Sequence, residues 1–392
     1  MIVRRTISDS VLQAAHSYPV VAITGPRQSG KTTLVKTLFQ NLPYVLLEDP
    51  DIRRYATEDP RGFLAKYQDG AVFDEAQRAP ELFSYLQGIV DQDPKPGRFI
   101  LTGSQQFGLL SGITQSLAGR VAMMILLPFS LDELTSAGVK TNRLEDVLCN
   151  GGYPPIHDRG LDARTWAANY VATYVERDVR QLISVRDLST FETFLRMCAA
   201  RCGQLVNLSG LANDCGISHN TARSWLSVLE ASYVVHTLAP HHRNFSKRLI
   251  KSPKLYFLDP GLAAWLLNIR SPDQITTHSM RGPLFETWVL SEILKSVFNS
   301  GNRPNLYFWR DRAGLEVDFI ADFGDRLIPI EVKSGATFVS EWLSPLKRWS
   351  ELAGKDGGPG WIVYGGDTGG KRKAIETVPW RQIGRLTKAL SK

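Results

Sequence analysis

The feature that most limits the fold of this chain is the stretch at residues 19–34, PVVAITGPRQSGKTTL. It starts with a continuous apolar run from Val20 to Ile23, which is typical of a strand buried on both faces of a parallel sheet. The residues from Gly25 to Thr32 then match the pattern G-x-x-x-x-G-K-[ST] at every fixed position. A loop of this kind turns successive amide N–H groups toward a polyphosphate at the start of the next helix. The stretch therefore predicts a strand, a phosphate-binding loop and a helix.

Each part of this loop has an expected role. Lys31 is expected to reach the β- and γ-phosphates, and Thr32 to give its hydroxyl to Mg²⁺. We expect the nucleotide to contact the whole run of Gly25, Pro26, Arg27, Gln28, Ser29, Gly30, Lys31, Thr32 and Thr33. The alternative is a chance glycine turn, but the apolar helix pattern that follows favours the phosphate loop.

A pair of carboxylates ends a second short apolar strand. In the sequence GAVFDE at residues 70–75, Asp74 and Glu75 come directly after the apolar residues. In a nucleotide site, Asp74 would hold Mg²⁺ through water and Glu75 would polarise the attacking water. The alternative is a strand that is followed by an acidic turn without chemistry. The phosphate loop upstream favours the catalytic interpretation.

Further candidates follow the next two strands. The sequence RFILTGS at residues 98–104 predicts a buried strand beside that of Asp74, with Thr102 or Ser104 as a sensor of the γ-phosphate. Arg120 precedes another apolar strand, and its guanidinium could neutralise charge on the transferred phosphoryl group of its own subunit or of a neighbour. A surface salt bridge is the alternative for Arg120.

Together these residues resemble the AAA+ class of P-loop ATPases, with Gly25 to Thr32 as Walker A, Asp74 and Glu75 as Walker B, and residues 102–104 as the first sensor. With LPFS at 127–130 and GGYP at 151–154, the chain is similar to a prokaryotic AAA+ family in which the ATPase module is fused to an uncharacterised carboxyl-terminal region. The resemblance implies an ATP hydrolase that uses ATP and Mg²⁺. We also expect a homo-oligomer, with a ring as one candidate form.

The middle of the chain predicts a lid and then a helix-turn-helix. Residues 162–200 are largely helical in pattern, as expected of a lid over a nucleotide, and their aromatic stripe favours packing over ligand binding. Residues 204–231 predict two short helices, capped by Ser209 and Ser218 and separated by a turn at Gly216. On the second helix, Asn220 and Arg223 would face away from the apolar side, where they could touch DNA.

A basic connector follows this pair of helices. Two predicted strands, at residues 233–238 and 255–258, are joined by a segment that contains no acidic residue. The segment carries Arg243, Lys247, Arg248, Lys251 and Lys254. We interpret it as the wing of a winged helix that lies against DNA phosphates. The net charge of +7 permits such a partner. A protein-binding winged helix with a merely solvated loop is the alternative.

Four residues in the last part of the chain suggest a metal site. Glu286 lies on a predicted helix, Asp318 on a strand, and Glu331 and Lys333 stand two apart on the next strand. This set resembles the PD-(D/E)xK nuclease-like fold. The resemblance implies that the three carboxylates hold one or two Mg²⁺ ions while Lys333 orients water or neutralises charge. The alternative is a fold that has lost its chemistry and keeps the four residues as a salt-bridge cluster.

The predicted architecture is α/β, with a parallel-sheet core at residues 1–150, a helical lid at 151–200, a winged helix at 201–270 and a restriction-endonuclease-like domain at 280–392. The predicted function is an ATPase that remodels or translocates on DNA, branched or damaged DNA included, with optional strand cleavage. The alternative is a nucleotide-gated, STAND-like signalling switch. No window approaches the ~20 apolar residues that span a bilayer, so we expect a cytoplasmic protein without membrane contact. Its four cysteines contain no C-x-x-C pair, which favours reduced thiols.

Overall fold

The computed structural model describes residues 3–104, 116–174, 188–241, 251–311, 314–372 and 374–391. The chain divides into two compact units. The first comprises Met1–Phe129 with Ala231–Tyr233 and Val297–Arg303, and the second comprises Ser130–Glu230, Val234–Ser296 and Pro304–Lys392. Residues 130–150, which we expected to complete the first domain, therefore cluster with the second unit.

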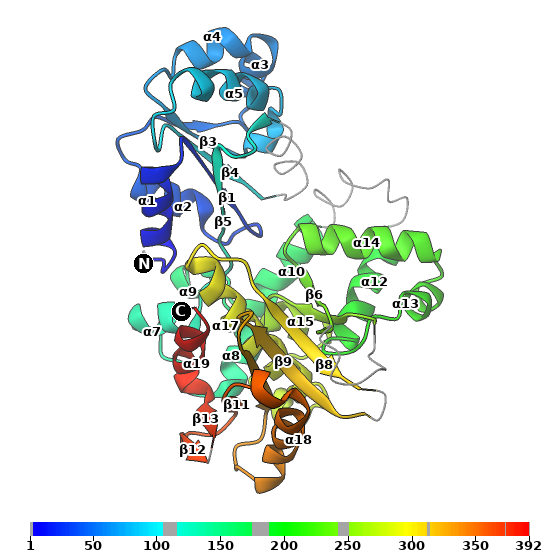
Figure 1. Cartoon of the computed structure of the whole chain (residues 1–392). Coiled ribbons are helices and arrows are strands. Elements are labelled where there is room, and N and C mark those ends of the chain that lie inside the picture. Colours follow the sequence, from blue (N-terminus) through cyan, green and yellow to red (C-terminus); the bar gives the residue numbers. More distant parts are fainter. Residues whose placement is uncertain are drawn as a thin grey trace. The chain divides into compact units, whose positions relative to one another are not determined.

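The first unit is built on a parallel sheet of five strands in the order β2-β3-β4-β1-β5 (Figure 1). Its strands are β1 (Val20–Thr24), β2 (Tyr44–Leu46), β3 (Ala71–Asp74), β4 (Phe99–Gly103) and β5 (Val121–Ile125). Its helices are α1 (Ser8–Ser17), α2 (Lys31–Leu38), α3 (Pro50–Glu58), α4 (Pro60–Ala65) and α5 (Leu82–Gln92), with a short 3-10 turn η1 (Ala76–Arg78) after β3.

The central strand β1 explains why this unit has three layers. Its residues are buried along their whole length, and successive side chains point to opposite faces. Val21 and Ile23 pack with apolar residues of α1 and α2. Val20 and Ala22 pack in a second core with residues of α3, α4 and α5. The continuous apolar run of the sequence thus serves two cores at once, as expected of a parallel sheet that is covered on both faces.

The second unit begins with helices and a small sheet. Its helices before the carboxyl-terminal sheet are α7 (Leu131–Ser136), α8 (Leu144–Asn150), α9 (Pro154–Asp158), α10 (Ala163–Tyr174), α12 (Leu188–Ala200), α13 (Leu208–Asp214), α14 (His219–Ala231), α15 (Pro260–Leu266), α16 (Pro272–Thr277) and α17 (Arg281–Asn299). Strands β6 (Val235–Leu238) and β7 (Lys254–Phe257) pair antiparallel. The aromatic side chains of α10 and α12 are buried, which confirms the predicted packing.

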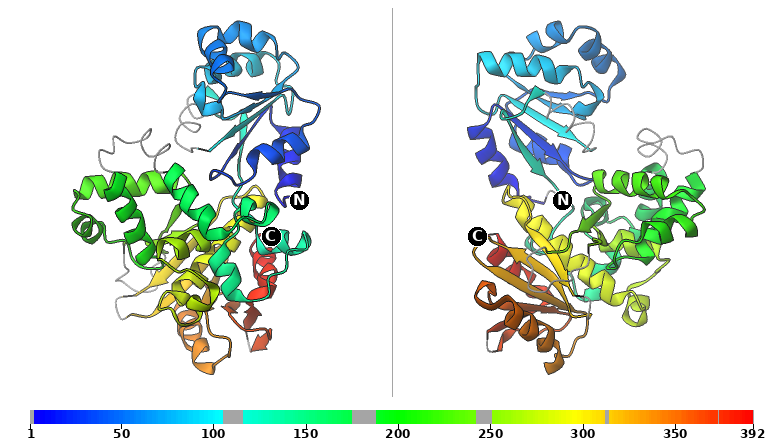
Figure 2. Two further views of the ribbon diagram at one scale, coloured as in Figure 1. Left: turned by 180° about the vertical axis from the view of Figure 1, so that it is seen from behind. Right: turned by 45° about the vertical axis from the view of Figure 1, so that its right-hand side comes forward.

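A six-stranded mixed sheet completes the second unit, in the order β12-β13-β11-β10-β9-β8. Its strands are β8 (Leu306–Arg310), β9 (Glu316–Asp322), β10 (Leu327–Lys333), β11 (Gly360–Tyr364), β12 (Gly370–Arg372) and β13 (Ile375–Pro379). Helix α18 (Leu343–Ala353) covers one face through Leu346 and Trp349, and α19 (Ile383–Leu390) follows β13 (Figure 2). Strands β8 to β10 form an antiparallel meander, whereas β10 and β11 are parallel.

Two local expectations need correction. The side chain that caps α13 is Asn207, which accepts from the amide of Gly210 at 3.0 Å, and not Ser209. Ser218 caps α14 as expected, accepting from the amide of Thr221 at 3.1 Å. Lys254, which we assigned to the basic connector, is the first residue of β7 and is 2% exposed.

The remaining sequence-based expectations concern membrane contact and thiols. None of the helices that the structure describes is both long and apolar enough to cross a membrane. All four cysteines are free thiols, and Cys149, Cys198 and Cys202 are buried. Cys215 is half-buried. The expectation of core or near-core thiols is therefore confirmed.

Candidate functional site

The phosphate loop connects β1 to α2 and takes a backbone that demands glycine at its start. Gly25 has a φ of 146°, and a Cβ placed there would come within 2.1 Å of the carbonyl oxygen of Leu126. Gly30, immediately before α2, has a φ of 98°. Only glycine adopts the first of these conformations at such close backbone contact without strain. The two fixed glycines of the motif thus shape the loop.

The interior of the loop has the donors that a triphosphate needs. Lys31 is buried, and its ammonium donates to the carbonyl oxygens of Gly25 at 3.0 Å and Pro26 at 2.8 Å. Ser29 is also buried, and its hydroxyl has no hydrogen-bond partner among the described residues. Since a buried polar group without a partner is costly, this hydroxyl is suited to accepting or donating to a ligand. The loop residues therefore fit a bound triphosphate.

The carboxylate of Asp74 lies beside the metal-binding hydroxyl that the sequence predicts. Thr32 Oγ1 donates to Asp74 Oδ2 at 2.7 Å. The hydroxyl of Thr102 donates to Asp74 Oδ1, and that of Tyr44 donates to Asp74 Oδ2. The hydroxyl and the carboxylate are thus already adjacent, as Mg²⁺ in P-loop sites requires. The donor set at the end of β3 fits Mg²⁺ with a nucleotide.

Glu75 takes an unusual backbone conformation. Its φ of 56° lies in the left-handed region, which costs a non-glycine residue about 1–3 kcal/mol. Ser104 Oγ donates to Glu75 Oε2 at 3.2 Å, and the side-chain amide Nε2 of Gln77 donates to the same oxygen. The strained turn therefore ends in a carboxylate that two side chains orient. Lys31, Asp74, Glu75 and Ser104 come together at the carboxyl ends of β1, β3 and β4.

Tyr44 is a residue of this site that sequence reasoning missed. Burial raises the pKa of its hydroxyl well above the usual value, and the hydrogen bond to Asp74 adds to this effect. The ammonium of Lys36 lies 3.9 Å from the centre of its ring. Tyr44 therefore stays a neutral donor to the Asp74 carboxylate. The apolar strand that it begins was recognised, but no motif marks the tyrosine.

Arg5 is a second residue that the sequence did not reveal. It is 6% exposed, and its guanidinium donates to the carbonyl of Ser29 in the phosphate loop and to that of Leu127, each at 2.7 Å. The guanidinium also lies 4.8 Å from the centre of the Phe129 ring. Arg5 thus ties the back of the phosphate loop to the segment that follows β5.

Arg120 is not brought to the phosphate loop of its own chain. Its carbonyl accepts from the amide of Val20 at the start of β1, whereas the loop follows the other end of β1. Its side chain pairs with Asp91 and donates to the carbonyl of Ala118 at 3.0 Å. The surface salt bridge that we weighed for Arg120 is therefore present. Action on a neighbouring subunit stays a prediction.

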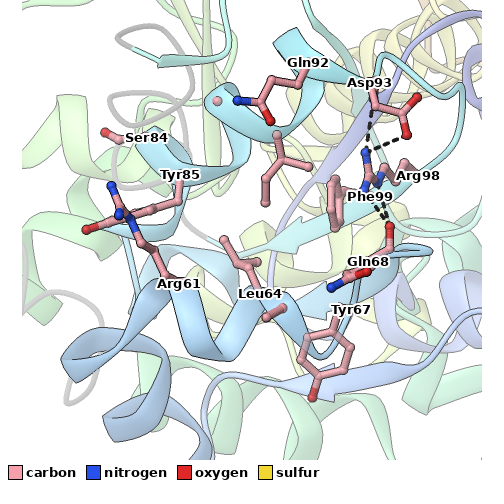
Figure 3. A pocket seen from close by; sticks show the side chains of 13 residues that line it. Arg61, Leu64, Tyr67, Gln68, Ser84, Tyr85, Gln92, Asp93, Arg98 and Phe99 are labelled. Atoms are coloured by element: carbon pink, nitrogen blue, oxygen red, sulfur yellow. Dashed lines mark hydrogen bonds and ion pairs between the residues drawn. The ribbon is translucent and has the colours of Figure 1, made fainter.

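A separate cavity of about 730 Å³ opens at the amino-terminal end of β4, between α4 and α5 (Figure 3). Leu64 and Phe99 line its apolar part, and Arg61 and Tyr85 lie together at its edge. Arg98 donates to the carbonyl of Gln68 and to Asp93. The phosphate loop follows the carboxyl end of the parallel neighbour β1, so this cavity is distinct from the nucleotide site.

The four residues of the predicted metal site come together in the second unit. Lys333 Nζ donates to Glu331 Oε1 at 2.5 Å, and the amide of Val332 donates to Asp318 Oδ2 at 2.8 Å. Burial raises the pKa of Glu286 to about 7 and that of Glu331 to about 8, and the neighbouring charge of Asp318 adds to both shifts. These carboxylates therefore share one buried environment.

Lys254 enters the same cluster from β7. Its ammonium lies 3.2 Å from Glu286 Oε1 and 2.5 Å from Glu316 Oε1. Burial lowers the pKa of Lys254, but the charges of Glu286, Asp318 and Glu316 raise it by more. The net shift of this pKa is therefore upward. The hydroxyl of Tyr256 also donates to Glu286. Lys254 is thus a buried, charged partner of the carboxylates.

Mg²⁺ does not fit this cluster as it stands. Among the residues that the structure describes, no group of three or more Asp, Glu, His or Cys side chains is arranged to hold a metal ion. Glu331 Oε2 is buried without a hydrogen-bond partner, but its other oxygen is paired with Lys333. The ammonium groups of Lys254 and Lys333 supply the positive charge instead. Glu286, Asp318, Glu331 and Lys333 therefore meet, but as an ion-pair cluster.

The predicted DNA-contacting residues divide into two groups. Asn220 and Arg223 are exposed on α14, and Lys251 is exposed just before β7. The predicted contacts of Arg243, Lys247 and Arg248 lie outside the described residues.

Family models match three consecutive parts of the chain. Residues 17–135 match an AAA domain, residues 141–273 match a domain of unknown function (DUF8612), and residues 281–383 match another domain of unknown function (DUF4143). The AAA match covers β1, the phosphate loop, Asp74, Glu75 and Ser104. The three matches do not assign a function to the second unit.

Two relatives cover most of the chain. They are the "Uncharacterized protein Rv2008c" of Mycobacterium tuberculosis and the "Uncharacterized protein Mb2031c" of Mycobacterium bovis. Each is 33% identical over 343 residues, which is 86% of this chain and 75% of the relative.

Solved structures resemble the chain only weakly. A Walker-type ATPase of Pyrococcus abyssi is 16% identical with a TM-score of 0.45, and covers 68% of this chain and 96% of its own. A STAND protein with a tetratricopeptide repeat sensor from Pyrococcus horikoshii is 13% identical with a TM-score of 0.24, and covers 76% of this chain and 47% of its own. Likenesses at this level support no conclusion about function. The identity to the mycobacterial proteins and the AAA match do: the chain belongs to the family of those two proteins, and its first unit carries a P-loop ATPase domain of the AAA type.

Proposed function

We propose that the chain is a Mg²⁺-dependent ATPase that uses ATP hydrolysis to remodel DNA or to move along it. The observation that carries the DNA part is the division of α14 into two faces. Ala222, Trp225 and Leu229 are buried on one face, whereas a second set of side chains on the helix is polar and exposed. The exposed residues are His219, Asn220, Arg223, Ser224 and Ser227.

The hydrolytic step would use the side chains of Lys31, Asp74 and Glu75. Thr32 and Asp74 would hold Mg²⁺, which would supply positive charge against the charge that develops during phosphoryl transfer. Lys31 binds the β- and γ-phosphates once its ammonium exchanges the loop carbonyls for phosphate oxygens. Glu75, which Ser104 orients, accepts a proton from the attacking water. Thr102 donates its hydroxyl to Asp74 and would help to hold that carboxylate in position.

The DNA contact would begin at α14. Arg and Asn side chains form hydrogen bonds with base edges and phosphates, and a helix of this kind enters the major groove by its amino-terminal part. Asn220 and Arg223 lie in the first turns of α14. Lys251 adds an exposed cation beside β7. Since phosphate contacts release counterions, binding should weaken steeply with salt.

The test is an ATPase assay of the full chain against duplex, forked and single-stranded DNA at low and moderate salt. We expect at least one DNA to stimulate hydrolysis, and Arg223→Ala to weaken that stimulation several-fold without changing hydrolysis in the absence of DNA. Arg348→Ala is the matched control, because Arg348 is an exposed arginine on α18. An ATP hydrolysis rate that no DNA changes, together with no detectable DNA binding at low salt, would refute the proposal.

A second candidate is a nucleotide-gated switch whose second unit binds protein and has no catalytic activity. The observation that favours it is the acidic cluster, in which Lys254 and Lys333 neutralise the carboxylates where a nuclease would hold metal. For the same reason our proposal contains no strand-cleavage step. Slow hydrolysis that no DNA changes, combined with an intact plasmid after incubation with Mg²⁺, would favour the switch over the remodelling ATPase.

We also propose that Arg120 acts on the nucleotide of a neighbouring subunit in a homo-oligomer. The side chain of Arg120 is 34% exposed and lies away from its own phosphate loop, so that a neighbour could reach it. Mixing Glu75→Gln with Arg120→Ala chains tests this, because some mixed interfaces would then combine an intact Glu75 with an intact Arg120. Activity that exceeds the sum of the two variants supports action between subunits, and strictly additive activity contradicts it.

A further inference from the structure

Tyr233 takes a backbone conformation that is unusual for an aromatic residue. Its φ of 58° lies in the left-handed region, which strains a residue other than glycine. The amide of Val234 donates to the carbonyl of Leu229 at 3.0 Å, so that Tyr233 lies inside the turn that ends α14. This bond belongs to the Schellman motif, whose left-handed position is usually occupied by glycine. The chain therefore places a tyrosine where a glycine would be favoured.

The hydroxyl of Tyr233 is bonded to the strand that leads into the phosphate loop. It lies 2.7 Å from Thr24 Oγ1, and both side chains are buried. Thr24 Oγ1 donates to the carbonyl of Met124 at 3.3 Å, and a hydroxyl group has a single hydrogen, so Thr24 then accepts from Tyr233. Burial raises the pKa of Tyr233 to about 12, so its hydroxyl keeps the proton that it donates.

Thr24 is the last residue of β1 and directly precedes the phosphate loop. Its carbonyl accepts from the amide of Leu126 at 2.8 Å. The carbonyl of the next residue, Gly25, accepts from the ammonium of Lys31 at 3.0 Å. When a nucleotide binds, Lys31 would exchange this carbonyl for phosphate oxygens. Nucleotide binding would therefore change the hydrogen bonding of the residue next to Thr24.

The position of Tyr233 in the chain connects this contact with α14. Residues Ala231–Tyr233 belong to the first compact unit, whereas the residues before and after them belong to the second. Only Ser232 lies between the last residue of α14 and Tyr233. A change at Tyr233 therefore reaches the helix through a single residue rather than through a linker.

We infer that the hydroxyl pair of Tyr233 and Thr24 couples the nucleotide state of the phosphate loop to the carboxyl-terminal turn of α14. The inference rests on the proposed nucleotide binding and adds a means by which the proposed DNA-contacting helix is regulated. The turn has two conformations, the strained one that the contact with Thr24 holds and a relaxed one that follows when the contact is lost. Bound ATP orders the phosphate loop together with Thr24, which strengthens the contact and stabilises the end of α14.

The test is hydrogen–deuterium exchange of the full chain, followed by mass spectrometry, with and without Mg²⁺ and adenylyl imidodiphosphate, a non-hydrolysable ATP analogue. We expect the analogue to protect residues 25–32 and, in the wild-type chain, to slow exchange several-fold at residues 229–234. The amide of Val234 reports the opening of the turn, because its acceptor is the carbonyl of Leu229.

Tyr233→Phe removes the hydroxyl and keeps the aromatic ring. It should retain the protection at residues 25–32 and lose the slowing at residues 229–234. Since the readout is the difference that the nucleotide makes, a merely structural role of Tyr233 would leave it unchanged. The matched control is Tyr153→Phe, which removes another buried hydroxyl, bonded to that of Tyr170 at 3.3 Å, and should behave as wild type.

Two variants of Thr24 test the same contact from its other side. Thr24→Val keeps the shape of the side chain without the hydroxyl and should lose the slowing as Tyr233→Phe does. Thr24→Ser keeps the hydroxyl and should retain the slowing. If Tyr233→Phe does not fold, the comparison of these two variants decides the question.

DNA separates this inference from the proposed DNA function. Coupling between two binding sites is reciprocal, so DNA on α14 should lower the Kd of the analogue in the wild-type chain. We expect about a fivefold change if one neutral hydrogen bond carries the effect, and no change in Tyr233→Phe. Slowing by the nucleotide without an effect of any DNA would refute DNA as the partner of α14 and would still support the coupling.

Three results would overturn the inference. The first is a wild-type chain in which the analogue protects residues 25–32 without slowing exchange at residues 229–234. The second is equal slowing in the wild-type chain and in folded Tyr233→Phe or Thr24→Val. The third is a lack of protection at residues 25–32, which would refute nucleotide binding as well.

Discussion

The two units of this chain each combine lysine with carboxylates, but they arrange them in opposite ways. In the first unit, Lys31 donates to backbone carbonyls, and Asp74 accepts from the hydroxyls of Thr32, Thr102 and Tyr44. In the second unit, lysine ammonium groups contact the carboxylates directly, as Lys254 does with Glu286 and Glu316. The residue types are similar, and the pairing differs.

This difference shows how to distinguish an exchangeable site from a closed one. When a metal ion displaces a neutral hydroxyl from a carboxylate, the electrostatic cost is small. A buried ammonium, in contrast, cannot leave its carboxylates without exposing uncompensated charge. The nucleotide site is therefore prepared for a ligand that brings both phosphate and Mg²⁺. The acidic cluster already contains its cations.

The largest expected effect compares the lysines of the two sites. Lys31→Ala should lower ATP turnover by at least about a hundredfold, because an ammonium that stabilises transferring phosphate is lost. Lys333→Ala should change turnover less than twofold, since Lys333 pairs with Glu331 in the other unit. Steady-state phosphate release measures both. Equal losses of ATP turnover in the two variants would contradict the difference proposed between the two sites.

The next effect concerns stability. Lys254→Ala should lower the free energy of unfolding by about 3 kcal/mol in metal-free buffer, because it leaves buried carboxylates without their partner. Lys251→Ala should change it by less than about 0.5 kcal/mol, as is usual for an exposed residue. Urea unfolding followed by tryptophan fluorescence provides the values. A loss below about 1 kcal/mol for Lys254→Ala would show that the ammonium is not needed to neutralise the cluster.

A smaller effect is expected behind the phosphate loop. Arg5→Ala should reduce kcat/KM for ATP by about tenfold, because the carbonyl of Ser29 loses its guanidinium donor and the loop loses its fixed position. Arg4→Ala is the neighbouring control, since Arg4 is exposed and pairs only with the exposed Asp9 in the described ion pairs. Arg5→Lys should recover part of the loss. Identical kinetics for the Arg4 and Arg5 variants would show that Arg5 does not position the phosphate loop.

The smallest effect uses the thiols, all of which lie in the second unit. Burial raises the pKa of Cys202 to about 11, and its thiol contacts the hydroxyl of Thr287 next to Glu286. At pH 8 an alkylating reagent should therefore modify the half-buried Cys215 first and Cys202 much more slowly. Lys254→Ala should speed modification of Cys202 if the cluster loosens. Peptide mass mapping over time gives the order, and early modification of Cys202 in the wild-type chain would contradict it.

Local patterns allowed much of the first unit to be predicted. The strand at Val20, the loop from Gly25 to Thr32 and the acids after β3 each depend on residues that are close in sequence. Parallel strands then bring their carboxyl ends to one edge, so the meeting of Thr32, Asp74 and Thr102 could be expected. Ser104 lies in the same place for the same reason.

Other contacts could not be read from the sequence because they join distant segments. Arg5 meets the carbonyl of Leu127 across 122 positions, and no motif marks either residue. In the sequence, Lys254 looks like one more cation of the basic connector. In the structure it is the first residue of β7, and its ammonium pairs with Glu286 and Glu316. In the same way, residues 130–150 could not be assigned to the second unit before their packing was known.

The measurement that tests this account most directly is the number of Mn²⁺ ions bound by the wild-type chain with and without a non-hydrolysable ATP analogue. The account predicts a single ion per chain with the analogue and no tightly bound ion without it. Asp74 accepts from hydroxyl groups and needs a nucleotide to complete its metal site, whereas lysine ammonium groups already pair with the carboxylates of the acidic cluster. Tight binding of Mn²⁺ without nucleotide, lost in Asp318→Asn and kept in Lys31→Ala, would contradict it.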